Sequence, residues 1–382
     1  MLIFEALRAK FGDSLLLLYG TQQKPRLAVI DGGPPGVFND ALAPRLEEVR
    51  KERKLAATAP LVIDLMMVSH IDADHISGLL DLVRKLKDLR DSRKPVPWKI
   101  ERFWHNSFDD ILGNDDASVA SAASVMSPAS LGGMLHPEGS LVLASVSDGR
   151  DLRKLLEALG LGGNLPFKGL VRAGRKKVTL GNLKLTVLAP SDENLIALQK
   201  DWDKKVKILL EKEKAPETRT EIAAYVDRSV YNLSSLVVLA EAHGKRILLT
   251  GDGRGDHTLE GLEKAGLFDK DGRIEIDVLK MPHHGSERNI DADYFEKIRA
   301  RHYVISADGK FDNPDIKTLE MISQARPDDD FTLHLTYPTD EFSVPAIGKS
   351  IAAFLEQEKT RGRAYRVETR KPGDLALRIA LA

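Results

Sequence analysis

Short apolar segments alternate with turns along the first third of the chain. Residues 1–7 (MLIFEAL), 14–20 (SLLLLYG) and 26–33 (RLAVIDGG) have the apolar content and the flanking turn residues of β-strands. A longer apolar run, residues 59–70 (APLVIDLMMVSH), has the length of one buried strand. Residues 76–90 (ISGLLDLVRKLKDLR) instead have the spacing of an amphipathic helix. This part of the chain therefore predicts a sheet whose strands lead directly into helices.

The later part of the chain repeats the same mixture of strands, hairpins and helices. The predicted strands and hairpins cover residues 98–107 (WKIERFWHNS), 176–190, 233–252, 274–286 and 300–309. Two stretches interrupt this order. Residues 107–150 are rich in Ser, Ala, Gly and Asp and predict helical turns and loop, and residues 191–218 predict a charged helical excursion. The overall pattern is that of an α/β (α+β) protein.

Composition excludes several classes of protein. The chain has 382 residues, 42% of them hydrophobic and 30% charged, with a formal net charge of -1. These values are ordinary for a globular protein and give no general attraction to nucleic acid or membranes. There is no cysteine, so disulfides, thiolate zinc sites and cysteine nucleophiles are excluded. No apolar run is long enough for a membrane helix and the N-terminus lacks the pattern of a signal peptide, so we expect a cytoplasmic protein without a membrane partner.

Potential metal ligands are concentrated directly after the long apolar run. His70, Asp72, Asp74 and His75 fall within six positions, between the predicted strand and the predicted helix. Alternate residues of an extended segment point the same way, so the first three can converge, and a turn brings His75 to them. Imidazole and carboxylate ligands together suit zinc, manganese or iron. A solvated polar loop is the alternative, but the density of ligands favours a site for two metals.

Two further strand ends offer ligands. Asp252 ends the strand RILLTGD, and His283 and His284 follow the strand DVLK. Taken alone, the aspartate could belong to a turn and the histidines to the protein surface. Their shared position at the carboxyl ends of strands, where α/β proteins commonly bind ligands, favours one common site. Asp252 has two oxygens with which to bridge two metals.

Five segments together resemble a known superfamily. They are SHIDADHISG, NLSSLVV, RILLTGD, DVLKMPHHGS and NPDIKTL. In this order and spacing they resemble the metallo-β-lactamase superfamily, and within it the hydrolase domain of the ComEC/Rec2 competence proteins. The resemblance implies a four-layer αββα sandwich, two divalent metal ions (Zn²⁺ or Mn²⁺) and hydrolysis by a metal-bound hydroxide. It also implies a hydrolase domain over residues 1–325, followed by a C-terminal extension, residues 326–382, packed on it.

The resemblance assigns roles to individual residues. It implies that His70 and Asp72 bind the first metal, that Asp74 and His75 bind the second, and that Asp252 bridges both. It favours His284 over His283 as the last ligand of the second metal, which leaves His283 as a catalytic or substrate contact beside Asp74. The residues expected to contact substrate or to support the ligands are Asp31, His105, Asn232 and Ser286.

The sequence departs from the superfamily pattern at two points. Asp72 stands where the superfamily usually has histidine, a change shared by ComEC-like proteins, and the added carboxylate favours Mn²⁺ over Zn²⁺. The superfamily also has a further histidine between the signature and the bridging aspartate. His105, His136 and His243 lie in that interval, but none has the expected motif around it. The third protein ligand of the first metal is therefore left open.

The favoured function is a phosphodiesterase or nuclease acting on DNA or RNA. A carboxylate-rich site for two metals suits a phosphodiester, and basic clusters at residues 84–94, 172–177 and 287–301 could contact a phosphate backbone. One alternative is a hydrolase of small esters or lactones, with residues 107–150 as a lid. Another is a metal-binding regulatory module without turnover. A partner protein encoded nearby is a further hypothesis, and the sequence does not indicate the oligomeric state.

Overall fold

The computed structural model describes most of the chain. The described residues are 1–107, 110–111, 137–174, 177–197, 200 and 234–382. Much of the predicted insertion at 107–150, most of the predicted charged excursion at 191–218, and the candidate residues His136 and Asn232 lie outside them. Within the described residues, no helix has the length and apolar character needed to cross a membrane.

One sheet has six strands. It starts as an antiparallel meander along the chain and continues with parallel strands. The strand order is β16 (Ala376–Ala380), β1 (Leu2–Leu7), β2 (Leu15–Gly20), β3 (Pro25–Ile30), β5 (Leu65–Met67) and β7 (Phe103–Trp104).

The second sheet has eight strands. Five neighbouring strands are parallel, and two hairpins add three antiparallel strands at one edge. The strand order is β15 (Arg366–Thr369), β14 (Thr332–Leu335), β13 (Ile298–Ile305), β12 (Ile274–Lys280), β11 (Lys245–Leu249), β10 (Val237–Ala242), β9 (Leu183–Ala189) and β8 (Lys177–Leu180).

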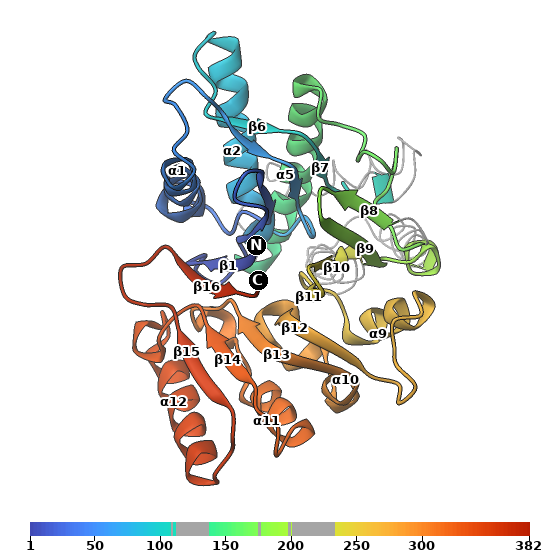
Figure 1. Ribbon diagram of the computed structural model, residues 1–382, viewed down its shortest axis with the longest axis vertical. Helices are drawn as coiled ribbons and strands as arrows, with labels where there is room; N and C mark the ends of the chain where they lie inside the picture. The colour runs from blue at the N-terminus through green and yellow to red at the C-terminus, as the bar shows by residue number, and fades with distance from the viewer. Residues whose placement is uncertain (108–109, 112–136, 175–176, 198–199, 201–233) are drawn as a thin grey trace, which may run out of the picture.

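Helices cover the outer faces of both sheets (Figure 1). Helices α1 (Ala43–Glu52), α2 (Ala73–Asp91) and α5 (Pro137–Leu159) belong to the six-stranded sheet. Helices α9 (Gly255–Lys264), α10 (Ala292–Lys297), α11 (Ile316–Ala325) and α12 (Pro345–Thr360) cover the eight-stranded sheet. A third apolar core fills the space between the two sheets. The αββα sandwich predicted from the sequence is confirmed.

The layering explains why a central strand such as β2 is apolar along its length. Every residue of β2 is buried, because alternate side chains enter the helix-covered core and the core between the sheets. Leu16 and Leu18 face the helices, whereas Leu15 and Leu17 face the other sheet. A strand covered on both faces has no polar side, so its sequence runs apolar instead of alternating.

The apolar run at residues 59–70 is not one strand, as predicted, but two. Strand β4 (Leu61–Ile63) pairs with β6 (Trp98–Ile100) in a separate two-stranded sheet, and β5 continues in the main sheet. The break is at Asp64, whose carboxylate accepts a hydrogen bond from Leu27 N at 3.2 Å and pairs with Arg26. A buried carboxylate requires such partners, so it turns the chain between the two strands.

Residues 326–382, predicted to be an extension packed on the domain, are built into both sheets. Strands β14 and β15 extend the eight-stranded sheet, and β16 pairs with β1 in the other. Figure 1 shows the two ends of the chain side by side, and Leu2 N donates to Ala382 O at 2.7 Å.

A glycine contact fixes the loop after β3 against the start of α2. Gly32 N donates to His75 O at 2.7 Å, and Gly78 N donates to Gly33 O at 3.1 Å. A Cβ atom on Gly78 would overlap the carbonyl of Gly32. Only glycine therefore allows the helix to approach the loop that carries Asp31.

We predict that Gly78→Ala destabilises the protein by about 1–3 kcal/mol, because the added methyl group forces the loop and the helix apart. The free energy of unfolding in urea measures this effect. Gly169→Ala is the matched control, because a Cβ there meets no atom within 4 Å; its effect should stay within about 0.5 kcal/mol. Equal stabilities of the two variants would contradict the prediction.

Candidate metal centre

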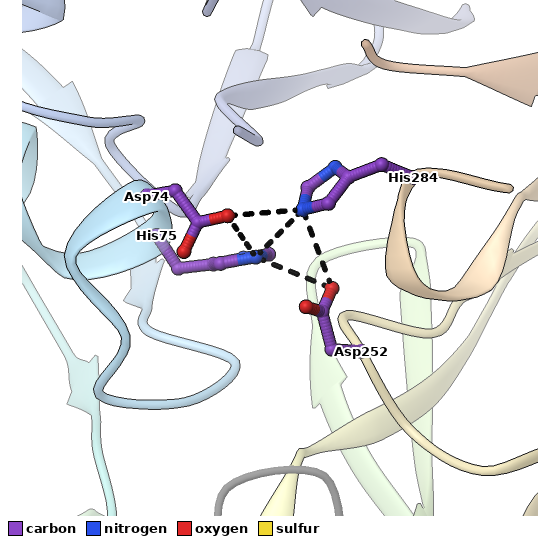
Figure 2. Close-up of side chains that lie close together, drawn as sticks. All are labelled: Asp74, His75, Asp252 and His284. Atoms are coloured by element: carbon purple, nitrogen blue, oxygen red, sulfur yellow. Dashed lines mark hydrogen bonds and ion pairs between the residues drawn. The ribbon is translucent and has the colours of Figure 1, made fainter. Parts of the chain in front are cut away.

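The predicted ligands meet where several strands end. His70 and Asp72 follow β5, Asp252 follows β11, and His284 follows β12. Asp74 and His75 lie in the first turn of α2, to which the loop after β5 leads. Figure 2 shows the side chains of four of these residues, contributed by three separate segments, pointing toward one another.

The tightest group consists of Asp74, His75, Asp252 and His284, whose potential ligand atoms all lie within 4.8 Å of one another. Nε2 of His284 is 3.2 Å from Asp74 Oδ2 and 3.3 Å from Nε2 of His75. Nε2 of His75 is 3.2 Å from Asp252 Oδ1. Three of the four residues are at most 3% exposed. Figure 2 shows these contacts as dashed lines that connect the potential ligand atoms of the four residues.

A second group, His70, Asp72 and Asp74, adjoins the first. Nε2 of His70 lies 3.5 Å from Asp72 Oδ2 and 3.6 Å from Asp252 Oδ2. The two oxygens of Asp252 thus face different groups: Oδ1 faces His75, and Oδ2 faces His70. This is the position that a carboxylate bridging two cations would occupy.

Buried polar atoms at the centre of the cluster indicate that its residues suit divalent cations. Nε2 of His70 is buried without a hydrogen-bond partner among the described residues, and Oδ1 of Asp252 is buried with Nε2 of His75 and of His284 at 3.2 and 3.6 Å. Buried polar atoms without partners are costly, so their presence at the centre of a ligand cluster calls for a binding species. Imidazoles and carboxylates together suit Mn²⁺, Zn²⁺ or iron. The two groups therefore offer donor atoms suited to divalent cations.

The pKa shifts of the histidines in the cluster also favour a bound cation. Burial alone would lower the pKa of His75 and His284, but nearby carboxylates, Asp252 foremost, raise the pKa of His75 well above its usual value and that of His284 to about 9. Burial and the neighbouring His75 lower the pKa of His70 to about 4. Without cations the carboxylates thus retain protons on two imidazoles. A bound cation would supply that positive charge and release the protons.

The other ring nitrogens fix the orientation of the imidazoles. Nδ1 of His75 donates to Asp31 Oδ2 at 2.9 Å, and Nδ1 of His284 donates to Ser306 O at 2.9 Å. Nδ1 of His70 lies 3.1 Å from Ser69 Oγ, which itself donates to Asp31. Each Nε2 is left facing the cluster, as in proteins whose histidines bind metal. Asp31, which was expected to support the ligands, accepts hydrogen bonds from His75 and Ser69.

Two residues of the site were missed in the sequence. Asp13, in the turn between β1 and β2, forms a fully buried ion pair with Lys280 at the end of β12. Oδ1 of Asp13 also lies 3.5 Å from Nδ1 of His284. Burial would raise the pKa of Asp13, but the ammonium of Lys280 and His284 hold it well below its usual range. The available signal was Lys280 itself, a charged residue that directly follows the apolar pair Val278 and Leu279 at the end of the strand.

Two predicted contacts lie outside both ligand groups. His105 follows β7, where burial, with Arg153 nearby, lowers its pKa to about 3. Its backbone is held by the side chain of Asn164. Ser286 accepts a hydrogen bond from Arg288 N at 3.5 Å and caps the turn at 287–289. Asn164 therefore holds His105 in place, and Ser286 supports the turn that follows the ligand loop.

His283 lies beside the cluster. Its Nε2 is 3.7 Å from Asp252 Oδ2, and its side chain is 29% exposed. It is not part of the tight group that contains His284. The structure thus places the two neighbouring histidines differently, with the second one buried among the ligands.

Comparison with known proteins gives matches in solved structures alone. No family model and no curated protein sequence matches the chain. The metallo-β-lactamase fold protein YhfI from Bacillus subtilis aligns over 99% of this chain and 100% of its own, with a TM-score of 0.40 and 10% identity. Zn²⁺-bound PqqB from Methylobacterium extorquens aligns over 99% and 100%, with a TM-score of 0.35 and 10% identity.

A third similar structure is CmlA, a diiron β-hydroxylase from Streptomyces venezuelae, with a TM-score of 0.37 and 11% identity. The alignment covers 100% of this chain but 54% of CmlA, so the chain spans about half the length of that protein. At such identities the likeness concerns the fold alone. The layers described above form an αββα sandwich, and the cluster of imidazoles and carboxylates beside its strand ends is a donor set that can hold divalent metal ions.

We predict that Lys280→Met destabilises the metal-free protein by about 3–5 kcal/mol, because it leaves the Asp13 carboxylate buried without its main partner. Adding Asp13→Asn should restore much of the loss, because the double variant removes both charges. Urea unfolding after chelation measures both variants. If the losses of the two single variants simply add in the double variant, the ion pair is not coupled as the structure indicates.

Proposed function

We propose that the chain is a metal-dependent phosphodiesterase that cleaves nucleic acid, related to the hydrolase domain of ComEC-like proteins. The observation that carries the proposal is the carboxylate of Asp252, with one oxygen toward each ligand group. Two divalent cations bound there would supply charge stabilisation for a phosphoryl oxygen and a nucleophile from water at neutral pH.

The exposure of the ligands indicates the side from which substrate approaches. The side chains of His70 and His75 are fully buried, whereas those of Asp72 and Asp74 are 22% and 21% exposed. Asp74 is thus positioned to accept a hydrogen bond from the attacking water and to orient it. Buried contacts hold Asp252 and the imidazoles in place. Substrate therefore approaches from the side that Asp72 and Asp74 line.

An aromatic and basic ledge beside the centre supports nucleic acid as the substrate. It consists of Phe11, Lys310 and Phe311. The two rings meet edge to face with centroids 5.2 Å apart, and Lys310 Nζ lies 4.0 Å from the Phe11 ring centre. Phe311 is 50% exposed, although large apolar side chains are usually buried. An exposed ring can stack an unpaired base while the lysine attracts its phosphate.

The ledge is attached to the ligand loops through backbone contacts. Gly12, next to Phe11, packs against the carbonyl of Asp74, and Asp13 N donates to Asp74 O at 3.1 Å. On the other side, Asp315 N donates to Gly285 O at 3.1 Å, next to His284. A strand with a base on the ledge would therefore bring a phosphodiester toward the cluster.

We predict that the metal-free protein cleaves nucleic acid when Mn²⁺ is restored, more rapidly than with Zn²⁺, because the site is rich in carboxylates. Asp74→Asn should lower kcat by about 10²-fold or more. Single-stranded DNA, duplex DNA and RNA are assayed in parallel with a chromogenic phosphodiester and a lactone. Cleavage of the lactone alone, or full activity of the variant, would contradict the proposal.

We predict that Phe311→Leu raises KM for single-stranded substrate without a comparable change in kcat, because stacking of one base contributes about 1–3 kcal/mol. Phe311→Trp keeps a stacking ring and should retain a KM near that of the wild type. The chromogenic phosphodiester, which carries no base, serves as the control and should be cleaved equally by all three proteins. An unchanged KM in the leucine variant would exclude the ledge from binding.

A further inference from the structure

We propose that His283 completes the ligand group of His70 and Asp72, and so supplies the imidazole that the sequence lacks before Asp252. The inference rests on the proposed two-ion site and assigns its missing protein ligand. Among the histidines between the signature and Asp252, His243 is exposed in a hairpin turn, and His105 lies buried beside Arg153.

The distances group His283 with His70. Nε2 of His283 lies 3.7 Å from Asp252 Oδ2, and Nε2 of His70 lies 3.6 Å from the same oxygen. Nε2 of His284 instead lies 3.6 Å from the other oxygen, Oδ1. Atoms that bind one ion through bonds of about 2.0–2.2 Å lie about 3–4 Å apart. Each of the two imidazoles therefore lies at a distance from Oδ2 at which one cation could bind both atoms.

The backbone directs the two neighbouring rings to opposite oxygens. His283 and His284 have φ values of 47° and 57°, a left-handed conformation that histidine adopts infrequently. The centroids of the two rings are 6.2 Å apart, and their planes meet at 68°. His283 N donates to Gly251 O at 3.1 Å, which ties this turn to the loop that carries Asp252. Strained backbone held by such contacts is typical of functional sites.

Few contacts within the described residues engage the two ring nitrogens of His283. Within the described part of the chain, its Nδ1 is buried without a hydrogen-bond partner, and its Nε2 faces Asp252. The side chain is partly exposed, whereas that of His284 is buried. His283 thus lies at the solvent-exposed edge of the cluster. There it could bind an ion that the buried His70 also binds.

The test uses the full-length protein after removal of metal by chelation. His283→Asn removes the imidazole but keeps a residue that tolerates positive φ. His243→Asn is the matched control, because His243 has a φ of 53° and lies in an exposed turn. Bound Mn²⁺ is counted by equilibrium dialysis, and electron paramagnetic resonance distinguishes an isolated ion from a coupled pair.

Wild type and His243→Asn should bind two ions as a coupled pair. His283→Asn should keep one ion and bind the other about tenfold or more weakly, with the signal of an isolated ion. Combined with His70→Asn, it should cause no further loss, because both changes affect the same ion, whereas combined with His284→Asn it should weaken both ions. Binding of two ions by His283→Asn with wild-type affinity would overturn the proposal, as would a wild type that binds fewer than two.

A second measurement applies if His283→Asn does not fold, which circular dichroism would show. Isotope-labelled histidines in the wild type are followed by NMR while Zn²⁺ is added. The Nε2 resonance of His283 should shift together with that of His70, and an unshifted resonance would overturn the proposal. Neither measurement uses substrate. A protein that binds the pair through His283 but cleaves no phosphodiester would contradict the proposed function and leave this inference intact.

Discussion

The burial of many charged groups in one place is the constraint on which the site depends. Asp13, Asp31 and Asp252 are buried together with the imidazoles of His70, His75 and His284. Ionised groups removed from water need close partners of opposite charge, and a group left alone is strongly destabilising. Lys280 neutralises Asp13, but Asp252 faces imidazoles on both of its oxygens. Divalent cations between them would satisfy the same charges and leave the imidazoles neutral.

The sandwich makes this arrangement possible because its strands end at fixed positions. The strands that lead to the site, β5, β11 and β12, are buried on both faces at their carboxyl ends. Packing on two sides fixes these strand ends, and the positions of the loops that follow are fixed with them. The contact between Gly32 and Gly78 joins the loop after β3 to the start of α2. Side chains from distant parts of the sequence therefore converge at one edge of the sandwich.

Much of this could be predicted from the sequence because the signals are local. The density of ligands from His70 to His75 and the strands before Asp252 and His283 indicated the cluster, and the resemblance carried by these segments implied the four-layer fold. Signals that depend on tertiary contact could not be predicted in this way. Asp64 splits one apolar run into two strands through contacts with another strand. Asp13 could not be recognised, because its partner Lys280 lies far away in the sequence. The direction of the His283 ring follows from a left-handed turn that residue types alone do not reveal.

The most direct test of the central claim is crystallographic. Crystals of the protein soaked in Mn²⁺ would be measured near the manganese absorption edge, so that anomalous scattering locates each ion. The account predicts two peaks flanking the carboxylate of Asp252, one beside His75 and His284 and the other beside His70 and Asp72. A single peak, or peaks that leave Asp252 without an ion on one of its oxygens, would contradict the account.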